Sequence, residues 1–169
     1  RTERSFVGRN FAYRPYFTDA LDGGIGRFHA LGTTSGERGY FFAAPVSDER
    51  GIIGVVAVKI TLDAFEATWA ESGATIIVQD MSNVIFLSDR ADWHFRTLGP
   101  MVEAALETIA QTRQYPITAL RPLAAHSRPL GGSNYQILTI DDAGGRAVYV
   151  MQTGLIAAAG WRVSILSPI

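Results

Sequence analysis

The sequence contains no cysteine, which excludes disulfide frameworks, thiolate metal sites and cysteine nucleophiles. It has no run of about 20 apolar residues of the kind that a membrane-spanning helix needs. It has no excess of positive charge either, because 15 lysines and arginines stand against 16 aspartates and glutamates. Without a basic stripe or a run of like charges, we expect no nucleic-acid partner. The lack of cysteine is compatible with a periplasmic location.

The composition is that of a globular protein. The chain has 169 residues, of which 47% are hydrophobic and 18% are charged. This balance is sufficient to bury a core. The length permits one large domain or two small ones, since domains commonly have about 100 to 150 residues. The order of the predicted elements decides between these possibilities.

Three extended segments separated by turn residues stand out in the first part of the chain. They are predicted at 26–33, 38–46 and 52–60, with glycine-containing turns between them. A helix capped by Thr61 and ended near Gly73 follows them. This pattern predicts an antiparallel meander of strands followed by a connecting helix.

The second part of the chain repeats the three-strand pattern after a hairpin and a helix. The predicted elements are a hairpin at 74–87, a helix from Pro100 to 114, an irregular stretch at 116–133, and strands at 135–140, 146–152 and 161–166. A hairpin, a helix and three strands resemble the strand order of a PAS-like domain, in which helices cover one face of an antiparallel sheet. The sequence therefore predicts an α+β fold with two such domains in tandem, 1–66 and 67–169.

Lys59 is the only lysine, against fourteen arginines, and it lies near the end of the most apolar strand. Alternation along the strand places it on the same face as Ile53, Val55 and Ala57. If that face is buried, the ammonium needs an anionic partner, because an unpaired buried charge is strongly unfavourable. The alternative is that the strand end frays and the ammonium extends to water.

Thr33 and Ser35 are two residues apart, so an extended backbone points both hydroxyls to one face, although such a cluster also suits an ordinary turn.

Arg14 precedes Pro15, which favours an extended backbone that can aim the guanidinium inward. A guanidinium binds a carboxylate through two parallel hydrogen bonds, and the alternative is a surface arginine stacked on a tyrosine. Together these groups match a small ligand with a carboxylate at each end.

Several segments resemble a known family. Residues 10–17 (NFAYRPYF), 30–42 (ALGTTSGERGYFF) and 54–60 (GVVAVKI), and more weakly 74–88 and 93–98, resemble the periplasmic sensor of the four-carbon-dicarboxylate sensor kinases, the DctB family. The resemblance implies a tandem PAS-like (PDC, double Cache) fold with succinate, fumarate or malate bound in the membrane-distal domain. It also implies that the ligand contacts four residues: Arg14, Thr33, Ser35 and Lys59. Tyr13 and Tyr40 are weaker candidates.

The resemblance further implies that the full protein is a homodimeric inner-membrane histidine kinase that phosphorylates a response regulator. This chain would be its periplasmic binding module, with no catalysis, metal or cofactor of its own. The long N-terminal helix of the family is not visible in these residues. We therefore expect the first domain to be incomplete at its N-terminus, and the oligomeric state of this chain stays open.

A comparison within the chain predicts a single dicarboxylate pocket. Aligning 160–165 with 54–59 by hand places Ile165 where the first domain has Lys59, so the cation is missing there. We therefore expect the second domain to act as a spacer or a transmitter.

Two other functions stay open. An enzyme is disfavoured because His29, His94 and His126 fit no metal or nucleophile motif, and the acidic pairs at 48–49 and 141–142 lie in turns. A Cache module for an amino acid, or one that feeds a chemoreceptor, is the second alternative. An amino-acid site needs an acidic group for the ammonium, and Glu37 is the only acidic residue in the pocket segments.

Overall fold

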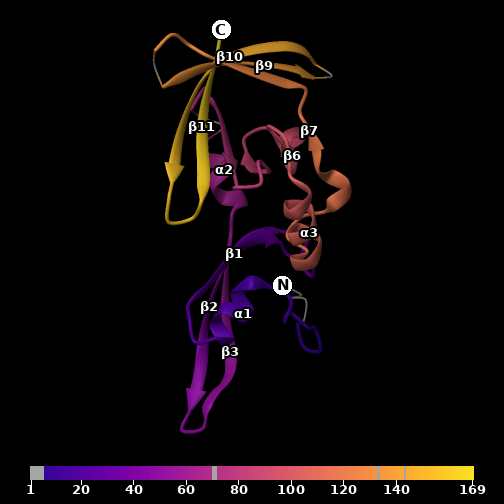
Figure 1. Cartoon of the computed structure of the whole chain (residues 1–169), viewed down its shortest axis with the longest axis vertical. Coiled ribbons are helices and arrows are strands. Elements are labelled where there is room, and N and C mark those ends of the chain that lie inside the picture. The colour runs from indigo at the N-terminus through magenta and orange to yellow at the C-terminus, as the bar shows by residue number, and fades with distance from the viewer. Residues whose placement is uncertain (1–5, 70–71, 133, 143) are drawn as a thin grey trace. The chain divides into compact units, whose positions relative to one another are not determined.

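The computed structural model divides the chain into two compact units (Figure 1). It describes residues 6–69, 72–132, 134–142 and 144–169. The first unit comprises Arg1–Leu62 and Glu107–Pro116, and the second comprises Asp63–Leu106 and Ile117–Ile169. The assignment of domains at 1–66 and 67–169 stays a prediction. Residues 1–5, 70–71, 133 and 143 of the predicted segments lie outside the described residues.

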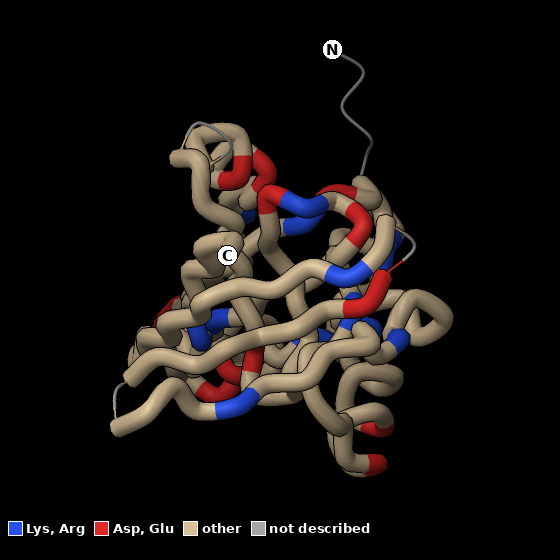
Figure 2. The backbone as a smooth tube through the Cα atoms, turned by 90° about the horizontal axis from the view of Figure 1, so that it is seen from above, with Lys and Arg blue, Asp and Glu red and all other residues tan. Residues whose placement is uncertain are grey.

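Acidic and basic residues are intermixed along the described part of the chain (Figure 2). In that part, no helix combines the length and the apolar character that crossing a bilayer requires. The same residues contain no group of three or more His, Asp or Glu side chains arranged to hold a metal ion.

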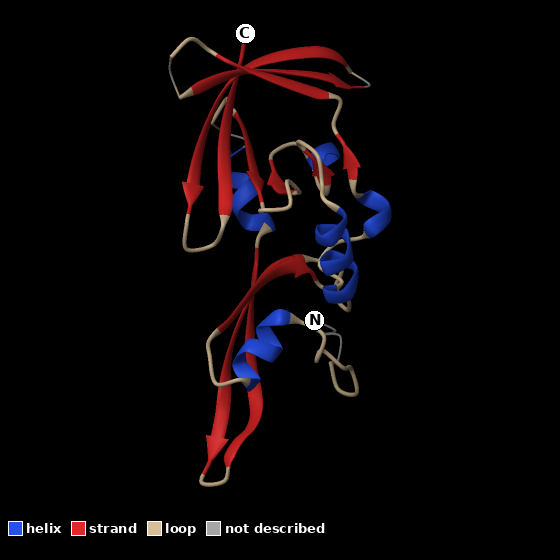
Figure 3. Ribbon diagram, viewed as in Figure 1, coloured by secondary structure: helices blue, strands red, loops and turns tan. Residues whose placement is uncertain are grey.

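The first unit is built on a three-stranded antiparallel sheet, which confirms the predicted meander. Its strands β1 (Gly26–Leu31), β2 (Arg38–Asp48) and β3 (Gly51–Thr61) pair in chain order. The helix α1 (Pro15–Leu21) lies against one face of the sheet (Figure 3). Tyr16 and Ala20 of this helix pack on Ala43, and the helix approaches closely because Gly26 has no Cβ to meet the Tyr16 carbonyl.

The second unit contains a six-stranded antiparallel sheet. Its strands, in spatial order, are β5 (Ile85–Ser88), β4 (Thr75–Gln79), β11 (Trp161–Pro168), β10 (Gly145–Ile156), β9 (Tyr135–Asp142) and β8 (Ala125–Pro129). The hairpin of β4 and β5 joins the sheet beside the last strand, β11. This arrangement confirms the predicted α+β fold, with a hairpin and a three-stranded meander in one sheet. Its core contains Ile77, Leu138, Ile140 and Leu166, all almost fully buried.

The remaining elements correct three predicted boundaries. They are α2 (Asp63–Trp69), η1 (Ala91–Trp93), β6 (Arg96–Thr97), α3 (Glu103–Thr112), η2 (Ile117–Ala119) and β7 (Arg121–Pro122). Helix α3 begins at Glu103 and not at Pro100. The stretch 116–133 is not irregular throughout, because β8 pairs with β9 there. Strand β8 was missed because its mostly exposed side chains carry no apolar alternation. Strand β10 also runs to Ile156, beyond the predicted end at 152.

Candidate functional site

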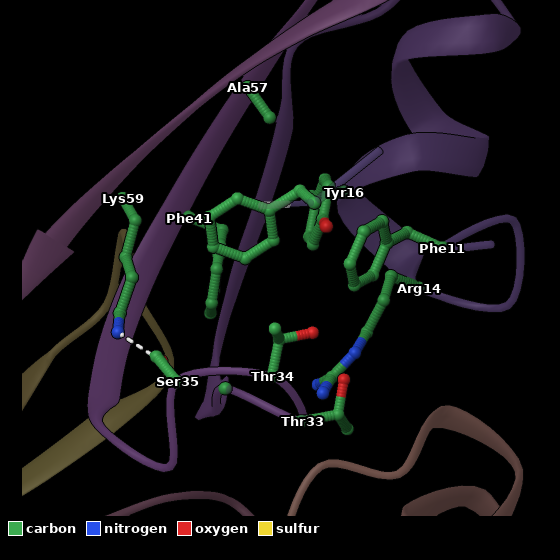
Figure 4. Close-up of a pocket in the computed structure, with 11 residues that line it drawn as sticks. Phe11, Arg14, Tyr16, Thr33, Thr34, Ser35, Phe41, Ala57 and Lys59 are labelled. Carbon is green, nitrogen blue, oxygen red and sulfur yellow. Dashed lines mark hydrogen bonds between the residues drawn. The ribbon is translucent and has the colours of Figure 1, made fainter. Parts of the chain in front are cut away.

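The first unit contains a cavity of about 440 Å³. It is lined by the segment before α1, the loop 32–37 and the helix-covered face of β2 and β3. Four of the residues predicted as ligand contacts line it, namely Arg14, Thr33, Ser35 and Lys59. In Figure 4, Arg14 and Lys59 reach toward the cavity from opposite sides, with the loop residues between them. The structure therefore brings the two predicted cations to one cavity.

Arg14 is held at the start of α1 by its proline neighbour. It is the N-cap residue, with an extended backbone (φ −86°, ψ 131°), and Pro15 is the first helical residue. The predicted extended backbone is confirmed at Arg14, and a helix that was not predicted begins at the next residue. Arg14 is only 2% exposed, so it is not a surface arginine, but it does lie over the ring of a tyrosine, Tyr13, as the alternative expected.

The guanidinium of Arg14 has one anchored nitrogen and one nitrogen without a partner in the described part of the chain. Its Nη2 donates a hydrogen bond to the carbonyl of Leu31, at the end of β1, over 3.0 Å. Its Nη1 is buried and has no hydrogen-bond partner among the described residues. A buried donor of this kind is strongly favoured to bind an acceptor. The anchored guanidinium therefore offers a fixed donor to a ligand in the cavity.

Lys59 lies on the cavity face of β3, opposite Phe41 of β2 in the strand register. Its stem lies over Gly39, where a Cβ would come within 2.5 Å of the lysine Cε. Its ammonium donates hydrogen bonds to Ser35 Oγ over 2.9 Å and to Glu37 Oε2 over 3.0 Å. The lysine therefore has the anionic partner that a half-buried charge needs, and one of its three N–H donors stays available to a ligand.

The loop 32–37 is shaped to present its hydroxyls beside Lys59. The Gly32 N–H donates to the Glu37 carbonyl over 2.9 Å, and the Gly36 N–H donates to the Gly32 carbonyl over 2.7 Å. Gly36 has a φ of +71°, a backbone conformation that glycine adopts without strain. The Ser35 hydroxyl occupies the space beside Gly32 that a side chain would need. The cluster of Gly, Thr and Ser is thus both a turn and a wall of the cavity, so the extended backbone expected at Thr33 and Ser35 is wrong and the alternative of a turn holds.

The two predicted tyrosines have different positions. Tyr13 does not line this cavity, but its hydroxyl is 3.3 Å from Thr33 Oγ1, and Arg14 lies over its ring at 5.4 Å. Burial alone would raise the pKa of Tyr13, but the hydrogen bond to Thr33 and the nearby guanidinium of Arg14 lower it below the ordinary value. Tyr40 does not reach the cavity. It precedes Phe41 on β2, so it lies on the opposite face and packs edge-on against Phe42.

Sequence reasoning missed the apolar part of the cavity. Phe11, Tyr16, Phe41 and Ala57 line it, and the rings of Tyr16 and Phe41 stack at 5.2 Å. Burial raises the pKa of Tyr16. Alternation along β3 had already placed Ala57 on the face of Lys59, but Phe41 could be placed there only once the register between β2 and β3 was known. Tyr16 carries no such signal, because α1 was not predicted.

The charges around the cavity favour an anion. Arg14 and Lys59 contribute two positive charges and Glu37, which is 56% exposed at its side chain, contributes one negative charge. Arg113, which follows α3, lies over the Tyr13 ring at 4.7 Å and adds a third positive charge nearby. A dianion with carboxylates at its two ends would neutralise this excess while accepting hydrogen bonds from both ends of the cavity.

Glu37→Gln should increase the affinity for a dicarboxylate by about 3- to 10-fold, because it removes an exposed internal carboxylate that competes for the Lys59 ammonium. Calorimetric titration of succinate into the variant would measure the change. Glu49→Gln removes the same charge at the exposed turn before β3 and should leave the affinity unchanged. A loss of affinity in Glu37→Gln would instead mean that Glu37 holds Lys59 in its binding position.

Comparison with known proteins gives relatives over almost the whole chain, although no family model matches it. The C4-dicarboxylate transport sensor protein DctB of Pseudomonas aeruginosa is 35% identical over 164 residues, which are 97% of this chain and 24% of that protein. The chain spans about a quarter of the length of the curated relatives that it matches.

Solved structures agree with this match. The crystal structure of the V. cholerae histidine kinase DctB sensor domain has a TM-score of 0.86 and 30% identity, covering 100% of this chain and 65% of that chain. The periplasmic domain of RsbU from Chlamydia trachomatis has a TM-score of 0.67 at 11% identity, covering 92% of this chain and 59% of that chain. The second likeness concerns the fold alone.

Proposed function

We propose that this chain, a homologue of the DctB sensor domains over nearly its whole length, binds four-carbon dicarboxylates such as succinate, fumarate or malate in the cavity of its first unit. The homology confirms the family resemblance found in the residues. The ligand itself is a proposal, and one observation carries it: a guanidinium and an ammonium line the same cavity of about 440 Å³.

In the proposed complex, each carboxylate of the ligand binds one cation. Arg14 binds the first carboxylate, and Thr33 lies beside it. Lys59 binds the second carboxylate together with Ser35, whose hydroxyl already contacts the ammonium. The carbon chain rests on Phe41 and its neighbours, which are the apolar lining.

The bonds available in this arrangement suit the sensing of a nutrient. Charge-assisted hydrogen bonds of roughly 1.5 to 3 kcal/mol each and neutral ones near 1 kcal/mol sum to about 5 to 8 kcal/mol. This sum corresponds to dissociation constants from roughly high micromolar to low micromolar. With such an affinity, the occupancy of the site changes most when the ligand concentration is in the micromolar range.

The proposal also covers the cellular location of this domain and the larger protein to which it belongs. The relatives are a transport sensor and a histidine kinase. We infer that this chain is the periplasmic module of an inner-membrane, homodimeric kinase that signals to a response regulator. The chain would then serve in binding and would leave catalysis to other parts of the protein. The amino-acid alternative has less support, because Glu37, the acidic residue of the pocket segments, is paired with Lys59.

Succinate at about 0.5 mM should raise the melting temperature of this protein by several degrees, because ligand bound only to the folded state adds to its stability. Butyrate has the same number of carbons but one carboxylate, so at the same concentration it should raise the melting temperature by no more than about 1 °C. Differential scanning calorimetry measures both. Equal stabilisation by the two compounds would reject a site in which both cations bind the ligand.

A further inference from the structure

The second unit has a cavity of its own, with a volume of about 360 Å³. It lies on the face of the six-stranded sheet that carries the core residues Leu138 and Met151, and β4, β8, β9, β10 and β11 all contribute to its walls. Around this cavity, the core-facing side of the sheet carries polar side chains as well as apolar ones, among them Gln79, Ser127 and Gln136. The cavity is thus close in size to the proposed dicarboxylate site and lies on the equivalent, core-facing side of its sheet.

The core-facing side of β11 carries a cation, which corrects the comparison of Ile165 with Lys59. Ile165 is 47% exposed and points away from the core, while Ser164 and Leu166 are buried on the other face. Arg162 shares that buried face by strand alternation and lines the cavity. The hand alignment paired an outward-facing residue with an inward-facing one, so the inference that the second unit lacks a cation at this face is wrong.

Arg162 is anchored at one nitrogen and has a second, buried nitrogen that no residue within the described ranges binds. Its Nη2 donates hydrogen bonds to the Asp80 carbonyl over 3.3 Å and to the Asn83 side-chain oxygen. Asn83 is itself fixed, because its Nδ2 donates to the Pro100 carbonyl over 2.6 Å. The Nε of Arg162 is buried and has no hydrogen-bond partner among the described residues. Arg14 has the same combination in the first unit.

We propose that this second cavity binds a small monocarboxylate. Arg162 supplies the cation for its single carboxylate, and the polar groups of Ser127 and Gln136 lie within the same walls. The short alkyl part of the ligand rests on Leu138 and Met151. One cation matches one carboxylate, because a second carboxylate would lie in the cavity without a positive partner. This site is independent of the proposed dicarboxylate site and would give the sensor a second input.

Propionate is the probe for this site, and nuclear magnetic resonance of the ¹⁵N-labelled chain is the measurement. With succinate present at saturation, added propionate should shift the amide resonances of Leu98, Ser127 and Gln136, with a dissociation constant on the order of 1 mM. Arg162→Gln should abolish these shifts and leave the succinate affinity unchanged. Lys59→Met should leave the propionate shifts unchanged, so that failure of either site is recognised separately.

A second variant keeps the test decisive if Arg162→Gln does not fold. Ser127→Leu fills the cavity from the edge strand β8 and should also abolish the propionate shifts. Ser167→Leu makes the same change on β11 outside the cavity and should preserve them. The proposal is overturned if propionate at about 20 mM, well above the expected dissociation constant, shifts none of these resonances. It is also overturned if the shifts persist in Ser127→Leu, or if they are confined to residues around Arg14.

Discussion

Lys59→Met should weaken succinate binding by at least about a hundredfold, the largest effect expected of any single substitution in this chain. The variant loses the charge-assisted bond to one carboxylate, which contributes roughly 1.5 to 3 kcal/mol. It also leaves Glu37 without its partner, so that a negative charge faces the incoming dianion. Isothermal titration of succinate into the variant measures the loss.

The fold should survive this change. A methionine fills a similar volume over Gly39 and has no charge to satisfy, so the free energy of unfolding should change by less than about 1.5 kcal/mol. Ile60→Met is the matched control, because Ile60 is the next residue of β3, is 46% exposed and does not line the cavity. If Lys59→Met binds succinate as tightly as Ile60→Met does, Lys59 is not a ligand contact.

Arg14→Lys should weaken succinate binding by about 10- to 100-fold, although it preserves the positive charge. The lysine ammonium is a point charge, and it cannot bind the Leu31 carbonyl and a carboxylate with the planar geometry of a guanidinium. Because Arg14 is only 2% exposed, water cannot replace the hydrogen bonds that the lysine would fail to make. Titration calorimetry with succinate measures this effect, and thermal unfolding without ligand measures any loss of stability.

Arg113→Lys provides the matched control for the second prediction. Arg113 also lies over the Tyr13 ring, but it is exposed and does not line the cavity. The same exchange of arginine for lysine should therefore change the affinity by less than about twofold. If the two variants lose affinity equally, the cavity attracts succinate through its overall positive field, and the proposed guanidinium contact is not made.

Much of the architecture could be predicted from the sequence because its signals are local. The alternation of apolar residues and the glycine-containing turns placed β1, β2 and β3 within a few residues of their observed bounds. The unusual position of the only lysine drew attention to Lys59, and the residue before Pro15 drew attention to Arg14. Each of these signals lies in a single residue and its immediate neighbours.

Other features carried no local signal. Strand β8 has mostly exposed side chains and becomes a strand by pairing with β9. Tyr40 was a candidate ligand contact only through the family resemblance, and it is its neighbour Phe41 that lines the first cavity. Ile165 looked equivalent to Lys59, yet it faces away from the core, and Arg162 lies on the buried side.

The amino-acid sequence by itself determined which residue types this protein has for binding an anion, and the order in which its strands follow one another. The tertiary structure alone decided that Arg14 and Lys59, 45 positions apart in the chain, line one cavity and that Glu37 pairs with the lysine. It also decided which face of each strand is buried. The physical reason is that a shift of one residue in strand register moves every side chain to the opposite face, and register is fixed by packing between distant segments.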